Sequence, residues 1–228
     1  MARLIRETRA VTEQNLGNLI NRRSLAGALA LGPLLAALNA QAQNSAAVGQ
    51  PAPDFSAVDT KGKNHKLGDF KGKLVVLEWT NPGCPFVQKH YSGEKTGNMQ
   101  SLQKEFTAKG VVWLSINSTE SASSDYLPPA RLASWQAEKS AVPTATLMDE
   151  SGKIGQLYGA RTTPHMYIIN PQGVLLYAGG IDNIPSARVD DIKTATNYVR
   201  QGLTEALGGK PLSVSVSRAY GCSVKYKA

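Results

Sequence analysis

The chain has 228 residues, of which 42% are hydrophobic and 18% are charged. This length and composition indicate a folded protein with one well-filled core, and they exclude an intrinsically disordered chain. The formal net charge is +8, but the basic residues are spread along the chain and form no stripe with interleaved aromatic residues. The sequence therefore does not indicate a nucleic-acid-binding protein.

The N-terminal region is typical of an export signal. Arg22 and Arg23 precede an uncharged stretch at 24–38, and the Ala-Gln-Ala pattern of a cleavage site follows at 40–42. The uncharged stretch has 15 residues and contains glycines and a proline, so it is too short to span a bilayer. Paired arginines are found in twin-arginine signals. We expect 1–42 to be removed and the mature protein to be periplasmic or otherwise exported, without stable membrane insertion; the alternative is an amphipathic N-terminal helix.

Turn signals and apolar runs alternate along the rest of the chain. The Thr-Lys-Gly-Lys sequence at 60–63 predicts a tight turn between two short strands. Runs of apolar and β-branched residues are typical of buried strands. Such strands are expected at 73–79, 111–117, 144–149, 165–170 and 173–181.

Helices are predicted between most of these strands. The first begins at Cys84 and is interrupted after a few turns, and the second ends at Gly110, in the position after the last turn that glycine usually takes. The last is amphipathic, with its apolar residues on one side. The expected helices cover 84–91, 98–109, 127–140, 154–160 and 190–209.

The order of these elements predicts the fold class. Strands joined by helical crossovers are parallel, and the closing hairpin adds an antiparallel pair, so the sheet is mixed and the fold is an α/β sandwich. We predict a single domain over 43–208, followed by a C-terminal tail at 209–228 that carries the second of the two cysteines.

Three segments together resemble the thioredoxin-like superfamily, and within it the peroxiredoxin-like branch of the alkyl hydroperoxide reductase/thiol-specific antioxidant family. Residues 48–79 are similar to the segment that precedes the reactive loop of that family, and "NPGCPFVQKHY" at 81–91 is similar to the loop itself. Residues 158–181 are similar to its cis-proline strand and closing hairpin. The resemblance implies a thioredoxin-like three-layer sandwich with an N-terminal β-hairpin and a C-terminal extension. The tail sequence "YGCSVKY" resembles that of a subgroup of exported thioredoxin-family proteins.

The resemblance implies that Cys84 is the reactive thiol. Cys84 stands at the expected start of a helix, where unpaired N–H groups and the helix dipole favour the thiolate. The chain departs from the thioredoxin Cys-x-x-Cys pattern: Val87 replaces the second cysteine if Cys84 aligns with the first, and Asn81 replaces the first if Cys84 aligns with the second. It departs from the peroxiredoxin pattern because Asn81 stands where a Thr or Ser binds peroxide, which makes Asn81 a candidate substrate-binding residue. The alternative is that Cys84 is an inert buried thiol or half of a permanent disulfide.

Further site residues follow from the resemblance. Glu78 lies six residues before Cys84, where thioredoxins carry a buried carboxylate that moves protons, so Glu78 is a candidate general acid or base with a raised pKa. The alternative is that Glu78 pairs with a lysine. Pro164 is the candidate cis-proline, and Thr163, His165 and Arg161 are candidates to contact substrate or stabilise the thiolate.

Cys222 lies 138 residues after Cys84. In an exported protein two cysteines suggest a pair. One hypothesis is that Cys222 resolves oxidised Cys84 in place of the missing neighbouring cysteine. A static structural disulfide and separate roles for two unpaired thiols are the alternatives.

These observations predict a thiol-dependent oxidoreductase of the cell envelope, whose Cys84 reduces peroxide or exchanges disulfides and is then restored by a thiol reductant. The resemblance implies no cofactor, and the three histidines, His65, His90 and His165, show no metal-ligand spacing with Cys84. The alternative function is a catalytically silent thioredoxin-fold binding module that holds a partner through the cis-proline loop and carries a structural disulfide.

Overall fold

The computed structural model describes residues 45–93 and 97–227, all within one compact unit, Gln41–Ala228. The expected export signal, residues 1–42, lies outside the described residues. Within the described ranges, no helix is both long enough and apolar enough to cross a bilayer.

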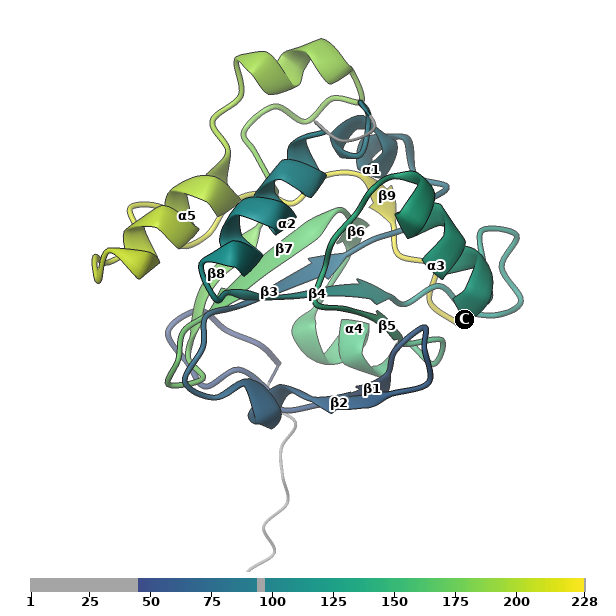
Figure 1. Cartoon of the computed structure of the whole chain (residues 1–228), viewed down its shortest axis with the longest axis horizontal. Coiled ribbons are helices and arrows are strands. Elements are labelled where there is room, and N and C mark those ends of the chain that lie inside the picture. Colours follow the sequence, from purple (N-terminus) through teal and green to yellow (C-terminus); the bar gives the residue numbers. More distant parts are fainter. Residues whose placement is uncertain (1–44, 94–96, 228) are drawn as a thin grey trace, which may run out of the picture. The chain divides into compact units, whose positions relative to one another are not determined.

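A five-stranded mixed sheet forms the centre of this unit (Figure 1). The strand order is β5-β4-β3-β7-β8; β3, β4 and β5 run parallel, and β7 pairs antiparallel with both β3 and β8. Every residue of β3, β4 and β7 is buried, as expected for strands covered on both faces. The strands are β3 Val75–Trp79, β4 Val112–Asn117, β5 Ala145–Met148, β7 His165–Ile169 and β8 Leu175–Gly179.

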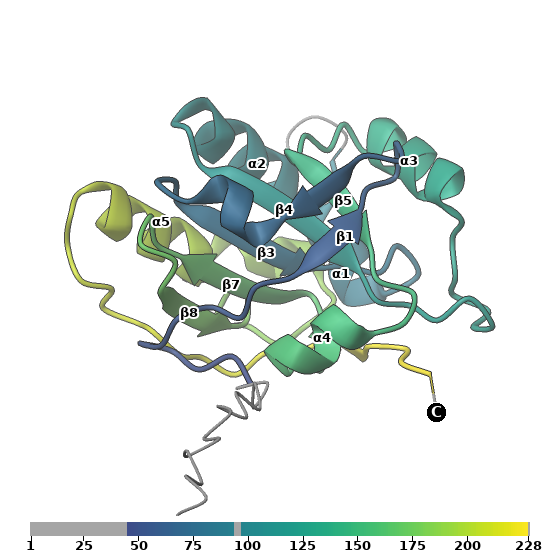
Figure 2. The ribbon, with the colours of Figure 1, turned by 90° about the horizontal axis from the view of Figure 1, so that it is seen from below.

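Helices cover the sheet on both sides, which gives three layers. Side chains of α1, α2 and α5 pack with one face of the sheet, together with Trp135 of α3. Helix α4 packs on the opposite face, as the view from below shows (Figure 2). The helices are α1 Pro85–His90, α2 Asn98–Ala108, α3 Pro129–Glu138, α4 Lys153–Tyr158 and α5 Tyr198–Leu207.

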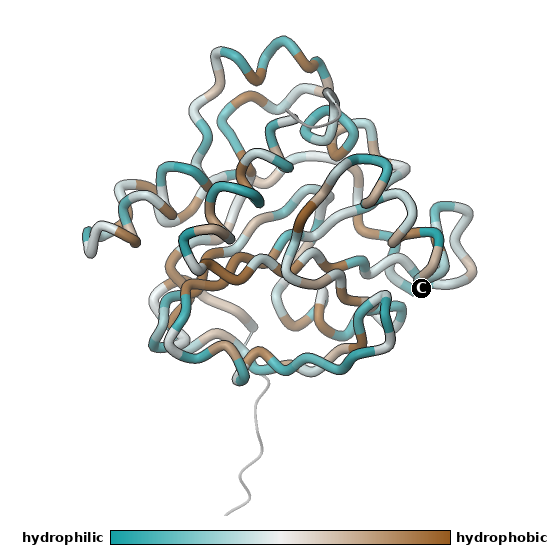
Figure 3. Tube along the Cα trace, in the orientation of Figure 1, coloured by the Kyte–Doolittle hydropathy of each residue, from teal (hydrophilic) through white to brown (hydrophobic). Residues whose placement is uncertain are grey.

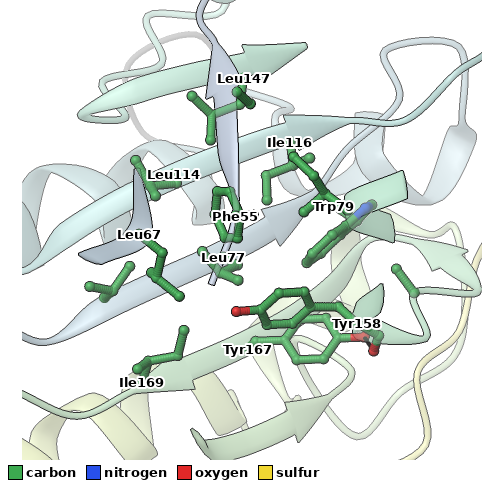
Figure 4. Packing of buried hydrophobic residues seen from close by; sticks show 14 of the residues in the cluster. Phe55, Leu67, Leu77, Trp79, Leu114, Ile116, Leu147, Tyr158, Tyr167 and Ile169 are labelled. Atoms are coloured by element: carbon green, nitrogen blue, oxygen red, sulfur yellow. Dashed lines mark hydrogen bonds between the residues drawn. The ribbon is translucent and has the colours of Figure 1, made fainter. Parts of the chain in front are cut away.

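A hairpin and a short turn complete the face that carries α4. Strands β1 (Ser56–Val58) and β2 (Asn64–Lys66) pair antiparallel, and the 3-10 turn η1 (Leu67–Phe70) follows. Apolar residues gather along the central strands (Figure 3), and on this face Trp79 packs against Tyr158 and Tyr167 at ring-centroid distances of 5.6 and 5.1 Å (Figure 4). Burial of one large apolar side chain is worth about 1.5–3 kcal/mol, so this layered core supplies most of the stabilisation.

The strands and most of the helices confirm the predictions, but the helix expected at 190–209 is divided. The first part is a 3-10 turn, η2 (Val189–Lys193), and α5 begins only at Tyr198. The physical reason is Asn197, whose side chain accepts the backbone N–H of Arg200 at 2.8 Å and caps the helix there. The prediction of one continuous helix was therefore wrong.

The C-terminal tail runs back across the domain after α5 (Figure 1, yellow). Its backbone bonds to the edge of β8, where Ala178 N donates to Ser215 O at 3.1 Å. Strand β9 (Cys222–Ser223) then pairs antiparallel with β6 (Thr162–Thr163), which directly precedes β7. Further on, Tyr226 donates its hydroxyl to the carbonyl of Ala160 at 2.6 Å. The tail is therefore attached on both sides of Cys222.

Candidate functional site

Cys84 is the N-cap residue of α1, at the end of the loop that follows β3. Its backbone N–H donates to Asn81 O at 3.0 Å, and its own carbonyl accepts the N–H groups of Val87 and Gln88. Pro85 follows in the first turn, where a missing N–H costs nothing. The side chain is only 1% exposed, and its thiol donates to the carbonyl of Thr163 at 3.1 Å. The loop after β3 thus places the Cys84 sulfur against the β6 segment.

Cys222 lies beside Cys84. In the β6–β9 pair Cys222 is opposite Thr163, the residue whose carbonyl accepts the Cys84 thiol. Burial, together with a hydrogen bond to the Cys84 side chain and the electrostatic effect of that side chain, raises the pKa of the Cys222 thiol to about 12. Cys222 is therefore a thiol at neutral pH, half-buried and in contact with Cys84; both cysteines are free.

The cis-proline that the resemblance implied is present. The Thr163–Pro164 peptide bond is cis, and both residues are buried. Thr163 contacts both cysteines, since its carbonyl accepts from Cys84 and its hydroxyl lies 3.5 Å from the carbonyl of Cys222. Thr163 is thus the residue that links the two halves of the site.

Asn81 shapes the loop before Cys84. It is 2% exposed, its side-chain oxygen accepts the N–H of Gly83 at 2.8 Å, and its amide donates to Asp125 at 3.2 Å. Both side-chain groups are occupied by the protein itself. The contacts of Asn81 are those of a residue that holds the turn, and its role in substrate binding remains a prediction.

Glu78 is fully buried on β3, and its carboxylate accepts four hydrogen bonds. Tyr91 donates to one carboxylate oxygen at 2.6 Å. Burial raises the pKa of Glu78, while the hydrogen bonds oppose the shift. The other oxygen accepts from Trp113 at 2.7 Å, Ser115 at 3.0 Å and Gln103 at 3.2 Å.

The partners of Glu78 bear on one of the two expectations for this residue, the pairing with a lysine. Its partners are neutral side chains, so the expected lysine partner is not found among the described residues. The raised pKa agrees with the expectation for a general acid. Tyr91 packs in the same apolar cluster as Cys84, which places the carboxylate and the thiol on one side of the sheet.

The side chain of His165 points away from Cys84, and Arg161 is exposed. His165 lies on β7 with its ring 4.6 Å from the ring of Tyr167, in the layer on the other face of the sheet from Cys84. Burial and the nearby charge of Arg161 lower the pKa of His165 to about 4. Arg161 is exposed and contributes its carbonyl, which accepts Val224 N at 3.1 Å, to the docking of the tail.

A cluster of buried polar side chains, separate from the one around Glu78, lies under the tail and was not identified from the sequence. Lys89 and His90 of α1 are buried beside Asp182 and Tyr220. Burial, helped by the charge of Lys89, lowers the pKa of His90 to about 3. The only feature of the sequence that could have pointed to this cluster is the position of Tyr220, two residues before Cys222. Among the residues that the structure describes, no three His, Cys, Asp or Glu side chains are grouped as metal ligands.

Curated proteins similar in sequence to this chain include thiol-disulfide oxidoreductases and a thioredoxin-like protein. The chain is 28% identical over 132 residues to the thiol-disulfide oxidoreductase ResA of Bacillus subtilis (strain 168), a match covering 58% of this chain and 66% of ResA. It is 30% identical over 127 residues to the thioredoxin-like protein YneN of the same organism, covering 56% and 68%. The chain thus spans about two thirds of the length of the curated relatives it matches.

Solved structures share the fold over a longer stretch. An uncharacterized conserved protein of Geobacillus kaustophilus superposes with a TM-score of 0.66 at 25% identity, covering 81% of this chain and 94% of that one. A hypothetical protein of Sinorhizobium meliloti 1021 superposes with a TM-score of 0.65 at 22% identity, covering 81% and 97%. The fold is therefore thioredoxin-like, as the sequence resemblance implied. Residues 48–178 match the model of the AhpC/TSA family, and the chain belongs to that family.

Proposed function

We propose that this protein is a thiol-dependent oxidoreductase in which Cys84 and Cys222 are a redox pair. The observation that carries the proposal is the docking of β9 on β6, which puts the two free thiols in contact. Membership of the AhpC/TSA family and similarity to a thiol-disulfide oxidoreductase support thiol chemistry. Cys222 then takes the part that a neighbouring cysteine plays in a Cys-x-x-Cys loop.

With a hydroperoxide as oxidant, the steps balance as follows. The Cys84 thiolate attacks one peroxide oxygen, so that an S–O bond forms, the O–O bond breaks, and the other oxygen leaves with a proton as water or an alcohol. The sulfur of Cys222 then attacks the sulfenic acid, forming the disulfide and releasing water. Two electrons from an external dithiol, itself oxidised to a disulfide, restore both thiols. Glu78, whose pKa is raised by burial, is proposed as the acid that exchanges protons in these steps.

A small oxidant is favoured by the position of the tail. An extended peptide binds by adding a strand to a free sheet edge, and the edge of β6 is already paired with β9. Cys84 is 1% exposed beneath this segment, so a protein disulfide must first displace the tail. The names of the curated relatives favour the second candidate substrate, a disulfide. Both reactions use the same pair of thiols.

The setting of the protein is proposed from the sequence. The twin arginines and the Ala-Gln-Ala pattern support export of the mature protein to the periplasm or beyond, with residues 1–42 removed. In an oxidising compartment a thiol pair of this kind needs a dedicated external reductant. The alternative function, a silent binding module, requires the cysteines to form a permanent structural disulfide.

A quenched-flow thiol count tests the proposal. The reduced protein is mixed with one equivalent of hydrogen peroxide or, separately, of oxidised glutathione, and free thiols are alkylated and mapped over time. We expect peroxide to remove both thiols of the wild type together, and the Cys222→Ser variant to accumulate a sulfenic acid on Cys84 that dimedone traps. In Cys84→Ser, we expect Cys222 to stay reduced.

Three outcomes distinguish the candidate substrates and functions. Faster loss with glutathione disulfide than with peroxide assigns the site to thiol–disulfide exchange. Equal and very slow loss with both oxidants contradicts the oxidoreductase proposal. A Cys84–Cys222 link that is already present and resists mild reduction supports the silent binding module instead.

A further inference from the structure

We infer that the buried cluster of Lys89, His90, Asp182 and Tyr220 is a positioning element that holds Cys222 against Cys84. The inference rests on the proposed function, because it concerns the step in which the two cysteines form a disulfide. The cluster joins the reactive helix α1 to the tail. None of its four side chains is more than 7% exposed.

Tyr220 is the member that belongs to the tail. Its hydroxyl donates to an oxygen of Asp182 at 2.5 Å and lies 3.3 Å from the Nε2 atom of His90. Asp182 comes from the segment after β8, and the N–H of Ile184 donates to the same carboxylate oxygen at 3.0 Å. The tyrosine hydroxyl is thus fixed between two elements of the domain, two residues before Cys222.

The hydrogen bonds define the direction of this chain of contacts. The side-chain amide of Asn98 donates to Nδ1 of His90 at 2.9 Å. Burial lowers the pKa of His90 to about 3, so the ring is neutral. Since Nδ1 accepts from Asn98, the one ring proton is on Nε2. Nε2 therefore donates to the Tyr220 oxygen, which in turn donates to Asp182. A phenylalanine can take neither part.

The cluster is also attached to the helix that starts at Cys84. Nζ of Lys89 lies 3.7 Å from Asp182 and donates to Ile184 O at 3.3 Å. Lys89 Nζ also lies 5.7 Å from the centre of the Tyr220 ring, and the ring of Phe86 packs edge-on at 6.0 Å. Residues near both ends of α1 thus contact Tyr220. The ring and hydroxyl of Tyr220 therefore set the distance between the tail and α1.

Gly221 connects Tyr220 to Cys222 and lets the tail backbone lie close to Thr163. Its φ is +134°, and a Cβ there would lie 2.0 Å from the carbonyl oxygen of Thr163, the atom that also accepts the Cys84 thiol. The tail backbone therefore approaches the site as closely as glycine allows. A buried ion pair adds little net stability, so the role that fits the cluster is to select one register for the tail.

The test separates the two chemical steps in the Tyr220→Phe variant of the full chain. Sulfenic acid formation on Cys84 is followed with hydrogen peroxide and dimedone trapping, and disulfide closure is followed by mass spectrometry after acid quenching. We expect sulfenic acid to form at the wild-type rate and closure to be slower by about tenfold or more, because a misplaced reactant reacts more slowly. Tyr226→Phe is the matched control, since it removes a tail hydroxyl on the other side of Cys222.

The outcomes distinguish this inference from the proposed function. If the wild type forms no Cys84–Cys222 link, the proposed function fails. If the wild type closes and Tyr220→Phe closes equally fast, the positioning role is overturned. Equal slowing in Tyr226→Phe, or slowing of both steps in Tyr220→Phe, also overturns it, because either result shows a general loosening of the fold. Circular dichroism confirms that both variants fold.

Discussion

Glu78 combines burial with a complete set of donors. A carboxylate transferred from water to the interior loses its hydration, and the four neutral hydrogen bonds restore only part of it, so the protonated form is favoured. The pKa of Glu78 is therefore raised in the folded protein. In the unfolded chain the pKa of this group returns to its ordinary value of 4.5.

This shift predicts how stability depends on pH. Between the unfolded and the folded pKa of Glu78, the folded state binds more protons than the unfolded state, so the free energy of unfolding falls as the pH rises through that window. We expect Glu78→Gln to remove this fall and to be less pH-sensitive than the wild type. Urea unfolding at a series of pH values above 4.5 measures it.

Glu105→Gln is the matched control. A hydrogen bond from Lys109 lowers the pKa of Glu105 on the surface, so its contribution to stability has the opposite sign and is lost as the pH falls. A Glu78→Gln variant with an unchanged pH slope would show that the carboxylate is ionised in the folded protein, which contradicts the role of an acid.

At the scale of elements, the pairing of β9 with β6 places Cys222 next to Thr163. The pair comprises two residues on each strand, with Cys222 opposite Thr163. A pair this short is not stable by itself. It depends on the attachments on either side, including Tyr220 and the contact of Glu120 N with Lys225 O at 2.9 Å.

Gly221→Ala tests this docking. The added Cβ meets the Thr163 carbonyl at 2.0 Å in a backbone conformation that L-residues avoid, so we expect a loss of about 1–3 kcal/mol and displacement of β9. Faster alkylation of Cys222 with slower disulfide closure is the expected readout. Gly208→Ala is the control, because its Cβ would have no neighbour closer than 3.4 Å and its φ is −80°; equal behaviour of the two variants would contradict the close approach.

The sequence was informative where structure is local. The strands at 73–79 and 111–117 could be predicted from their apolar runs, and the helix after Cys84 from its turn and proline. The divided region at 190–209 could not, because its periodicity is helical throughout and one capping side chain, Asn197, decides where α5 starts.

Contacts between distant segments were beyond the sequence. Glu78 was identified through the resemblance, but its donors come from the residue that follows α1, from α2 and from β4, and no local pattern links them. His165 was expected near Cys84 because it follows the cis-proline, yet alternation along β7 turns its ring to the other face of the sheet. That the tail could reach Cys84 was a hypothesis based only on the length of the tail. That the tail pairs with β6 could be learned only from the folded structure.

For the whole molecule, a Cys84–Cys222 disulfide would close a loop of 138 residues. Restricting the unfolded chain in this way is worth about 5 kcal/mol in the entropic model. We expect the oxidised protein to melt roughly 10 °C or more above the reduced protein, as measured by calorimetry under each condition. Cys222→Ser should show no difference between the two conditions, and a wild type with equal melting temperatures would argue against a link between these residues.

The central claim is that the two thiols are a working redox pair, and its most direct test is a redox equilibrium titration. The protein is equilibrated with graded ratios of reduced and oxidised glutathione, and with dithiothreitol ratios for the most reducing conditions, and the Cys84–Cys222 link is quantified by alkylation and peptide mapping. We predict one two-electron transition with a midpoint between about −300 and −120 mV, the range of catalytic dithiols. A midpoint well below about −300 mV would mark a structural disulfide, and failure of the link to form at any ratio would contradict the pairing itself.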